Sequence, residues 1–143
     1  MILLGILAVT ALPRFIGPSS FSAYSVRSEF ISALRQLQQQ AISNTDQCYR
    51  MDVTPAGYQS EASTDCVNNF VAVNPRLPWA DNTRVLRVYS FNGVGTDNFV
   101  VNVSQNGTIQ FGANQSCNGC SINVVAGDKV NIGISTEGYI YAR

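Results

Sequence analysis

The first fifteen residues constrain this chain most, because they are almost entirely apolar and run directly into a helical pattern. The stretch from Ile2 to Leu12 carries no charge, and Pro13 and Arg14 end it. A helix that crosses a bilayer needs about 20 apolar residues, so this stretch is too short to cross alone. We expect it to form a helix facing lipid or a partner protein, within an anchor segment that covers residues 1–18.

A second helical pattern covers residues 22–43. Apolar side chains recur there at steps of three or four, namely Ala23, Val26, Phe30, Leu34, Leu37 and Ala41. One apolar stripe with a polar opposite face is typical of a helix that packs on a sheet. Pro13 and Pro18 each lack the N–H that a helix interior needs, so we expect kinks near both.

From residue 47 to residue 142 the apolar period changes to two, as in strands. Tyr49, Met51 and Val53 alternate with polar residues, and the TPAG sequence at 54–57 predicts a hairpin turn. Asn106-Gly107 predicts a second hairpin, because a type I′ turn needs positive φ at both central residues.

These patterns predict an α+β fold. We expect a long N-terminal helix, kinked near Pro13 and Pro18, packed on an antiparallel sheet domain of about seven strands. The globular domain would then cover residues 19–143, with the amphipathic helix at 22–43 and the strands at 47–142.

Composition argues against several function classes. The 143 residues include nine basic and nine acidic side chains, so the formal net charge is zero. Nucleic-acid binding depends largely on phosphate neutralisation, and we therefore expect no nucleic-acid partner. The chain has no histidine, which removes the commonest general base and metal ligand. We predict no catalytic residues, no metal site, no cofactor and no enzymatic activity.

The string GILAVTALPRF, from Gly5 to Phe15, resembles the N-terminal segment of type IV pilins and pseudopilins. The residues of this string are most similar to those of pilins of the mannose-sensitive haemagglutinin (MSHA) type. The resemblance implies an assembly helix that includes Gly5 and Pro13. The prepilin peptidase site and the acidic residue that follows it in that family are absent, and we expect both to lie upstream of Met1.

The resemblance further implies a function. The chain would be a minor pilin of an MSHA-like type IV pilus, acting in assembly, surface attachment and biofilm formation. Its partners would be other pilin subunits, bound through the N-terminal helix, together with the inner membrane before assembly and a surface ligand. It would reside in the bacterial inner membrane, with its domain in the periplasm, and in the extracellular pilus.

Other interpretations of the chain stay open at this stage. The apolar stretch also fits a signal peptide, with Val9-Thr10-Ala11 as a small-residue cleavage site, or an ordinary buried helix. At the level of function, the alternatives are a filament-tip module that binds carbohydrate or DNA, and a pseudopilin of type II secretion.

The four cysteines are an even number in a chain whose N-terminus indicates the cell envelope, where disulfides persist. Of the three pairings, we favour Cys48 with Cys66 and Cys117 with Cys120. A redox role for the Cys117-to-Cys120 motif would require a following helix, which the pattern does not predict. A four-cysteine zinc site would require two close pairs, and Cys48 and Cys66 are far apart in sequence.

The proline-rich stretch around residue 79 is the candidate ligand loop, with Asn74, Arg76, Trp79 and Asp81 as candidate contacts. Long loops often carry function. The alternative is that Trp79 covers the edge of the core, because its large apolar surface is stabilised by burial.

Overall fold

The computed structural model describes residues 18–80, 82–88, 95–111, 115–116 and 120–143. Within these ranges the chain forms one helix and twelve strands in two antiparallel sheets. The helix is α2 (Pro18–Ser43). The first sheet, sheet A, consists of β1 (Cys48–Thr54), β2 (Gly57–Ser63), β3 (Val71–Ala72), β4 (Leu77–Pro78), β7 (Phe99–Val103), β8 (Ile109–Phe111) and β9 (Gln115–Ser116). The second, sheet B, consists of β5 (Arg84–Val88), β6 (Gly95–Thr96), β10 (Ser121–Ala126), β11 (Asp128–Ile134) and β12 (Ile140–Ala142).

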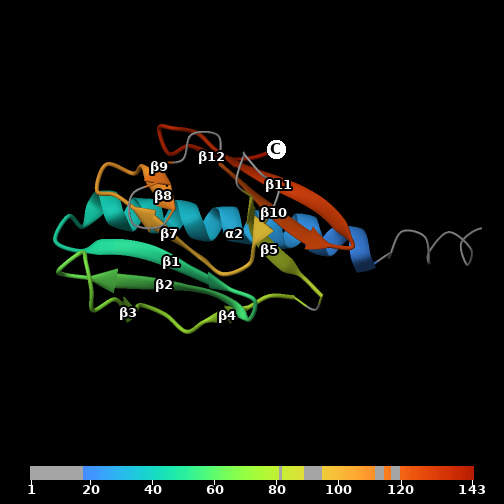
Figure 1. Cartoon of the computed structure of the whole chain (residues 1–143), viewed down its shortest axis with the longest axis horizontal. Coiled ribbons are helices and arrows are strands. Elements are labelled where there is room, and N and C mark those ends of the chain that lie inside the picture. Colours follow the sequence, from blue (N-terminus) through green and yellow to red (C-terminus); the bar gives the residue numbers. More distant parts are fainter. Residues whose placement is uncertain (1–17, 81, 89–94, 112–114, 117–119) are drawn as a thin grey trace, which may run out of the picture.

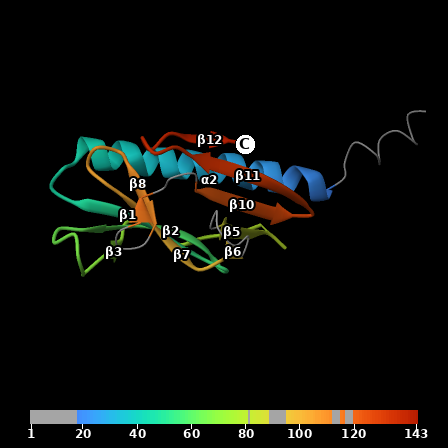
Figure 2. The same ribbon diagram turned by 45° about the horizontal axis from the view of Figure 1, so that its top comes forward.

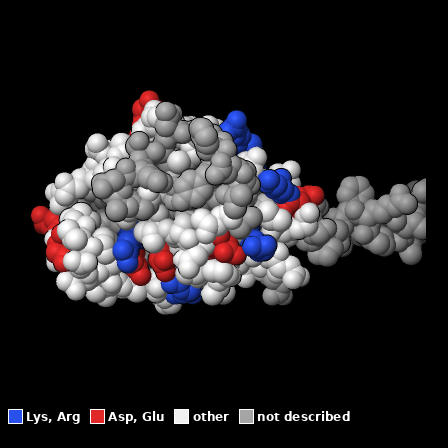
Figure 3. Space-filling model, viewed as in Figure 1, with Lys and Arg blue, Asp and Glu red and all other residues white. Residues whose placement is uncertain are grey.

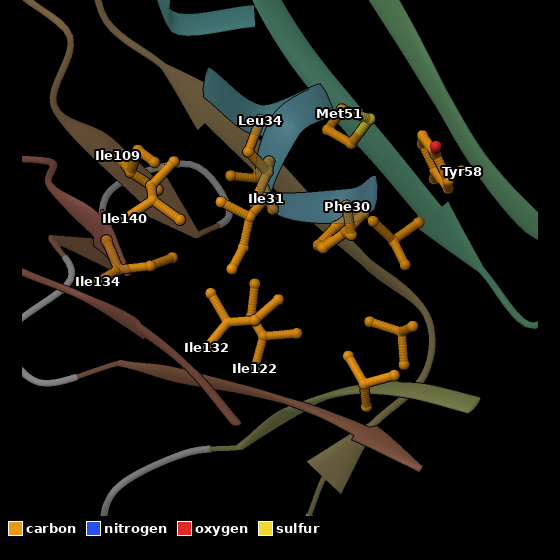
Figure 4. Packing of buried hydrophobic residues seen from close by; sticks show 14 of the residues in the cluster. Phe30, Ile31, Leu34, Met51, Tyr58, Ile109, Ile122, Ile132, Ile134 and Ile140 are labelled. Atoms are coloured by element: carbon orange, nitrogen blue, oxygen red, sulfur yellow. The ribbon is translucent and has the colours of Figure 1, made fainter. Parts of the chain in front are cut away.

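Helix α2 lies between the two sheets along the length of the molecule (Figures 1 and 2). It packs on β10, β11 and β12 of sheet B and on β1 and β7 of sheet A. All six residues of the predicted apolar stripe are buried. Figure 4 shows Phe30, Ile31 and Leu34 of the helix between Met51 and Tyr58 on one side and the isoleucines of sheet B on the other.

The predicted fold class is wrong in its helix and in its sheet. The described chain has more strand than helix. Its helix is a 26-residue element inside a two-sheet domain instead of a long N-terminal helix on one sheet of about seven strands. Alternating residues identify strands but not their partners, so the division into two sheets was not visible in the pattern. Three of the missed strands, β4, β6 and β9, are two residues long and show no periodicity.

The predicted kink near Pro18 falls at the boundary of the described residues, where Pro18 is the first residue of α2. The N–H groups of a helix's first turn have no partner within the helix, so proline is tolerated there. The helix ends at Ser43, and the Asn44 side chain accepts a hydrogen bond from the Asp46 N–H at 3.3 Å. Pro13 lies outside the described residues.

The β7–β8 hairpin forms at the predicted place with a different turn. Gly107 has a φ of 85°, but Asn106 is absent from the residues with positive φ. The Gly107 N–H donates to the Ser104 carbonyl at 2.9 Å, and the Ser104 N–H donates to the Thr108 carbonyl at 2.9 Å. This is a three-residue loop with a left-handed glycine, so the type I′ prediction was wrong.

Two turns from different sheets meet beside the C-terminal half of α2. The Gln38 amide nitrogen donates to the Gly107 carbonyl at 2.9 Å and to the Gly138 carbonyl at 2.6 Å. Gly138 has a φ of 90°, and a Cβ atom there would lie 2.3 Å from the Gly107 carbonyl oxygen. Gln38 therefore joins the β7–β8 turn of sheet A to the β11–β12 turn of sheet B.

Candidate functional site

A groove of about 250 Å³ runs between α2 and the β2–β4 edge of sheet A. We call it the Glu29 groove. Its lining residues on the helix are Glu29, Ser32, Ala33, Gln36, Leu37 and Gln40, and those opposite are Tyr58, Ser60, Val73, Asn74 and Leu77. Glu29 is the one ionisable acid among these residues. Val73 and Leu77 are 51% and 44% exposed, so the groove combines one carboxylate with neutral polar groups and accessible aliphatic surface.

Tyr58 fixes the carboxylate of Glu29. The tyrosine is 4% exposed, and its hydroxyl donates a 2.8 Å hydrogen bond to Glu29 Oε1. Burial, followed by the hydrogen bond and the charge of Glu29, raises the pKa of Tyr58. The hydroxyl therefore stays protonated at ordinary pH and holds Glu29 in place as an acceptor.

The ring of Tyr58 packs against two other aromatic rings. Its ring centroid lies 4.9 Å from that of Trp79 and 5.4 Å from that of Phe30 in the core. Phe30 and Glu29 are neighbours on α2, and β2 supplies Tyr58. The contacts that attach sheet A to α2 therefore also form the wall of the Glu29 groove.

The structure places the predicted ligand loop against the β1–β2 hairpin. Trp79 is partly buried, and its Nε1 donates to the Thr54 carbonyl at 2.8 Å. Arg76 forms a 2.5 Å ion pair with Asp52 and donates to Thr54 Oγ1 at 3.1 Å. The Asn74 side chain accepts from the Ser60 N–H at 3.2 Å.

The loop contacts therefore attach residues 74–79 to the hairpin. Asn74 is the one candidate that also lines the Glu29 groove, while Arg76 and Trp79 do not line it. Asp81 lies outside the described residues. The sequence did not single out Glu29 or Tyr58, because they are 29 positions apart and neither belongs to a motif.

The cysteines form structural cross-links where they are described. Cys48 and Cys66 are joined by a disulfide with a Cα–Cα distance of 5.2 Å, as predicted. Cys120 is also disulfide-bonded, and its predicted partner, Cys117, lies outside the described residues. In the described part of the chain no cysteine is free.

The segment proposed for assembly, including Gly5 and Pro13, lies outside the described residues. Within the described ranges, no helix combines the length and apolar character needed to cross a membrane. The same ranges contain no group of three or more metal-ligating side chains that could hold an ion.

Three ion pairs join charged side chains of the described residues, one of them the Arg76–Asp52 pair. Arg50 lies 2.6 Å from Glu61, and Arg84 lies 3.1 Å from Asp97. Figure 3 shows basic and acidic atoms next to one another on the face it draws. No family model, curated protein or solved structure matches this chain.

Proposed function

We propose that this chain is a structural subunit of a type IV pilus-like filament, most similar to a minor pilin of the MSHA type. The proposal rests on the resemblance of Gly5 to Phe15 and on one structural observation. The apolar stripe of helix α2 is buried against strands of both sheets.

The position of the helix supports the same function. The Pro18 end of α2 lies at one end of the long axis of the described domain (Figures 1 and 2). The apolar stretch from Ile2 to Leu12 precedes this end in sequence. In the proposed mechanism that stretch is buried first in the inner membrane and then against equivalent segments in the filament core. A uniformly apolar helix surface is stable in both places.

The full chain provides a direct test. It should float with phosphatidylcholine vesicles and, in a bacterium with a pilus assembly system, appear in the sheared surface fraction. A Leu7→Arg change should abolish both, because one arginine near the centre of an apolar helix costs about 2.5–3.5 kcal/mol of insertion free energy. A Leu7→Ile change is the matched control. A chain that stays monomeric in plain buffer and does not float would refute the proposal.

A further inference from the structure

The Glu29 groove contains a carboxylate that lacks a cation. Among the described acids, Asp52, Glu61 and Asp97 each pair with an arginine. Asp46, Asp65, Asp128 and Glu137 have no such pair among the described residues either, but none of them lines this groove. Glu29 has the Tyr58 hydroxyl as its one described partner and lines an open groove. Every other side chain that lines the groove is neutral at ordinary pH, so the site suits a basic group on an aliphatic stem.

The chain itself carries a group of that chemistry. Lys129 is its only lysine, and it is exposed at the start of β11. It has no ion-pair partner among the described residues. Neighbouring strand residues point to opposite faces, so Asp128 shares the face of buried Val130 while Lys129 lies on the outer face. Lys129 pairs across the ladder with Val125, which is partly buried.

The turn and the groove lie on different sides of α2. The turn between β10 and β11 belongs to sheet B and lies near the Pro18 end of the helix, where the Ser22 hydroxyl donates to the Ala126 carbonyl at 3.4 Å. The groove faces the β2–β4 edge of sheet A. A contact between the turn of one copy and the groove of another joins two different surfaces. When it is heterologous, such a contact closes into a ring or extends into an open helical chain.

We infer that the Glu29 groove receives the β10–β11 turn of a second copy of this chain, with Lys129 on the Glu29 carboxylate. The inference rests on the proposed function and adds a specific contact between subunits. Val73 and Leu77 cover the lysine stem and Val125, while Glu29 accepts from the ammonium group.

Such a contact is weak in isolation, because exposed ion pairs contribute little. In a membrane or filament, the N-terminal segments already hold copies together and raise the effective concentration of turn and groove. The contact then sets how neighbouring domains are arranged.

The single lysine makes the inference directly testable by zero-length carbodiimide cross-linking. The full chain is reconstituted in phosphatidylcholine vesicles, which contain no competing primary amine, as a mixture of ¹⁴N and ¹⁵N copies. We expect a Lys129–Glu29 amide in peptide pairs that join the two isotopes. Glu29→Gln, which keeps an acceptor for Tyr58, and Lys129→Gln should each remove it.

Exchanging the charges of Glu29 and Lys129 distinguishes a direct contact between them from an indirect effect of either substitution on the fold. The double variant Glu29→Lys, Lys129→Glu should restore the cross-link that each single variant loses. Glu137→Gln, which changes an exposed acid at the β11–β12 turn, is the matched control and should leave the link intact.

Other outcomes would overturn the inference. These are links from Lys129 to a different carboxylate, links confined to one isotope, and attachment of Glu29 to another protein in pilus preparations. If the chain associates in vesicles without the Lys129–Glu29 link, this contact is refuted and the proposed function stands. If it neither floats nor associates, both fail.

Discussion

The two sheets pack on the same helix, but different kinds of contact hold them in place. Sheet B presents a continuous apolar face, and α2 adds side-chain hydrogen bonds to its backbone, such as Arg35 Nη2 to the Ile140 carbonyl at 2.7 Å. Sheet A carries additional cross-links on its outer surface: the Cys48–Cys66 disulfide, the Arg50–Glu61 pair and the Arg76–Asp52 pair.

The difference follows from one irregular edge of sheet A. The main strands of both sheets are five to seven residues long, namely β1, β2 and β7 in sheet A and β5, β10 and β11 in sheet B. The edge of sheet A from residue 64 to residue 78 contains only two two-residue strands. Irregular backbone forms few ladder hydrogen bonds, so covalent and ionic contacts replace them. Sheet A should therefore depend on individual side chains more than sheet B does.

The largest effect should come from the core that the two sheets share. Leu34 is fully buried between them, so Leu34→Ala should lower the free energy of unfolding by about 2–5 kcal/mol. Denaturant melts followed by circular dichroism would measure it. Ser32→Ala on the exposed face of the same helix should change stability by less than about 0.5 kcal/mol. Equal effects for both variants would mean that α2 is not the central element.

The next effect should distinguish the sheets. Cys48→Ser removes a cross-link between residues 18 positions apart and should cost about 3 kcal/mol by the loop-entropy estimate. Hydrogen exchange should accelerate in β1 and β2 before it does in β10 and β11. Cys117→Ser, which opens a much shorter predicted loop, should have a smaller effect. Uniform acceleration in both sheets would contradict the proposed difference.

A smaller effect should appear where the sheets meet. Gln38→Ala leaves the carbonyls of Gly107 and Gly138 without their shared donor and should cost about 1–3 kcal/mol. Amide chemical shifts should change in both turns at once. Gln39→Ala, one residue further along and exposed, is the control. Changes confined to α2 would show that Gln38 does not join the two sheets.

The sequence predicted what depends on periodicity. The apolar stripe of α2, the Tyr49-Met51-Val53 face and the Cys48–Cys66 bridge all followed from spacing and residue type. The missed features depend on residues far apart in the chain. The Glu29–Tyr58 bond and the Gln38 contacts join positions that meet only after the sheets have formed, and no local pattern marks them.

The ligand-loop prediction illustrates the same limit. The sequence singles out Trp79 and Arg76 because they lie in a long loop, and long loops often carry function. For Trp79, covering the edge of the core is the alternative. In the fold, both side chains attach an irregular segment to the β1–β2 hairpin. Residue type alone could not distinguish these roles, because the hairpin partner Thr54 is more than twenty positions away.

The smallest predicted effect concerns acid sensitivity of the loop that carries Cys66. The Asp65 carboxylate accepts hydrogen bonds from the Ser63 hydroxyl at 2.6 Å and from the Asn68 N–H at 2.9 Å. The Ser63 bond, followed by the Asn68 backbone bond, lowers the pKa of Asp65 from 3.8 to about 2. Because the folded-state pKa is the lower one, the stabilisation is present above the unfolded value of 3.8.

That stabilisation should be lost as the pH falls from about 4 towards 2. Asp65→Asn should therefore be slightly less stable than the parent chain at pH 6, and the difference should be much smaller at pH 2. Melting temperatures of the two proteins across this range would measure the difference. Asp46 is an exposed acid before β1, and Asp46→Asn is the control. The difference in melting temperature between this variant and the parent should not change with pH. A constant difference between Asp65→Asn and the parent from pH 6 to pH 2 would mean that the loop hydrogen bonds do not depend on the ionised carboxylate.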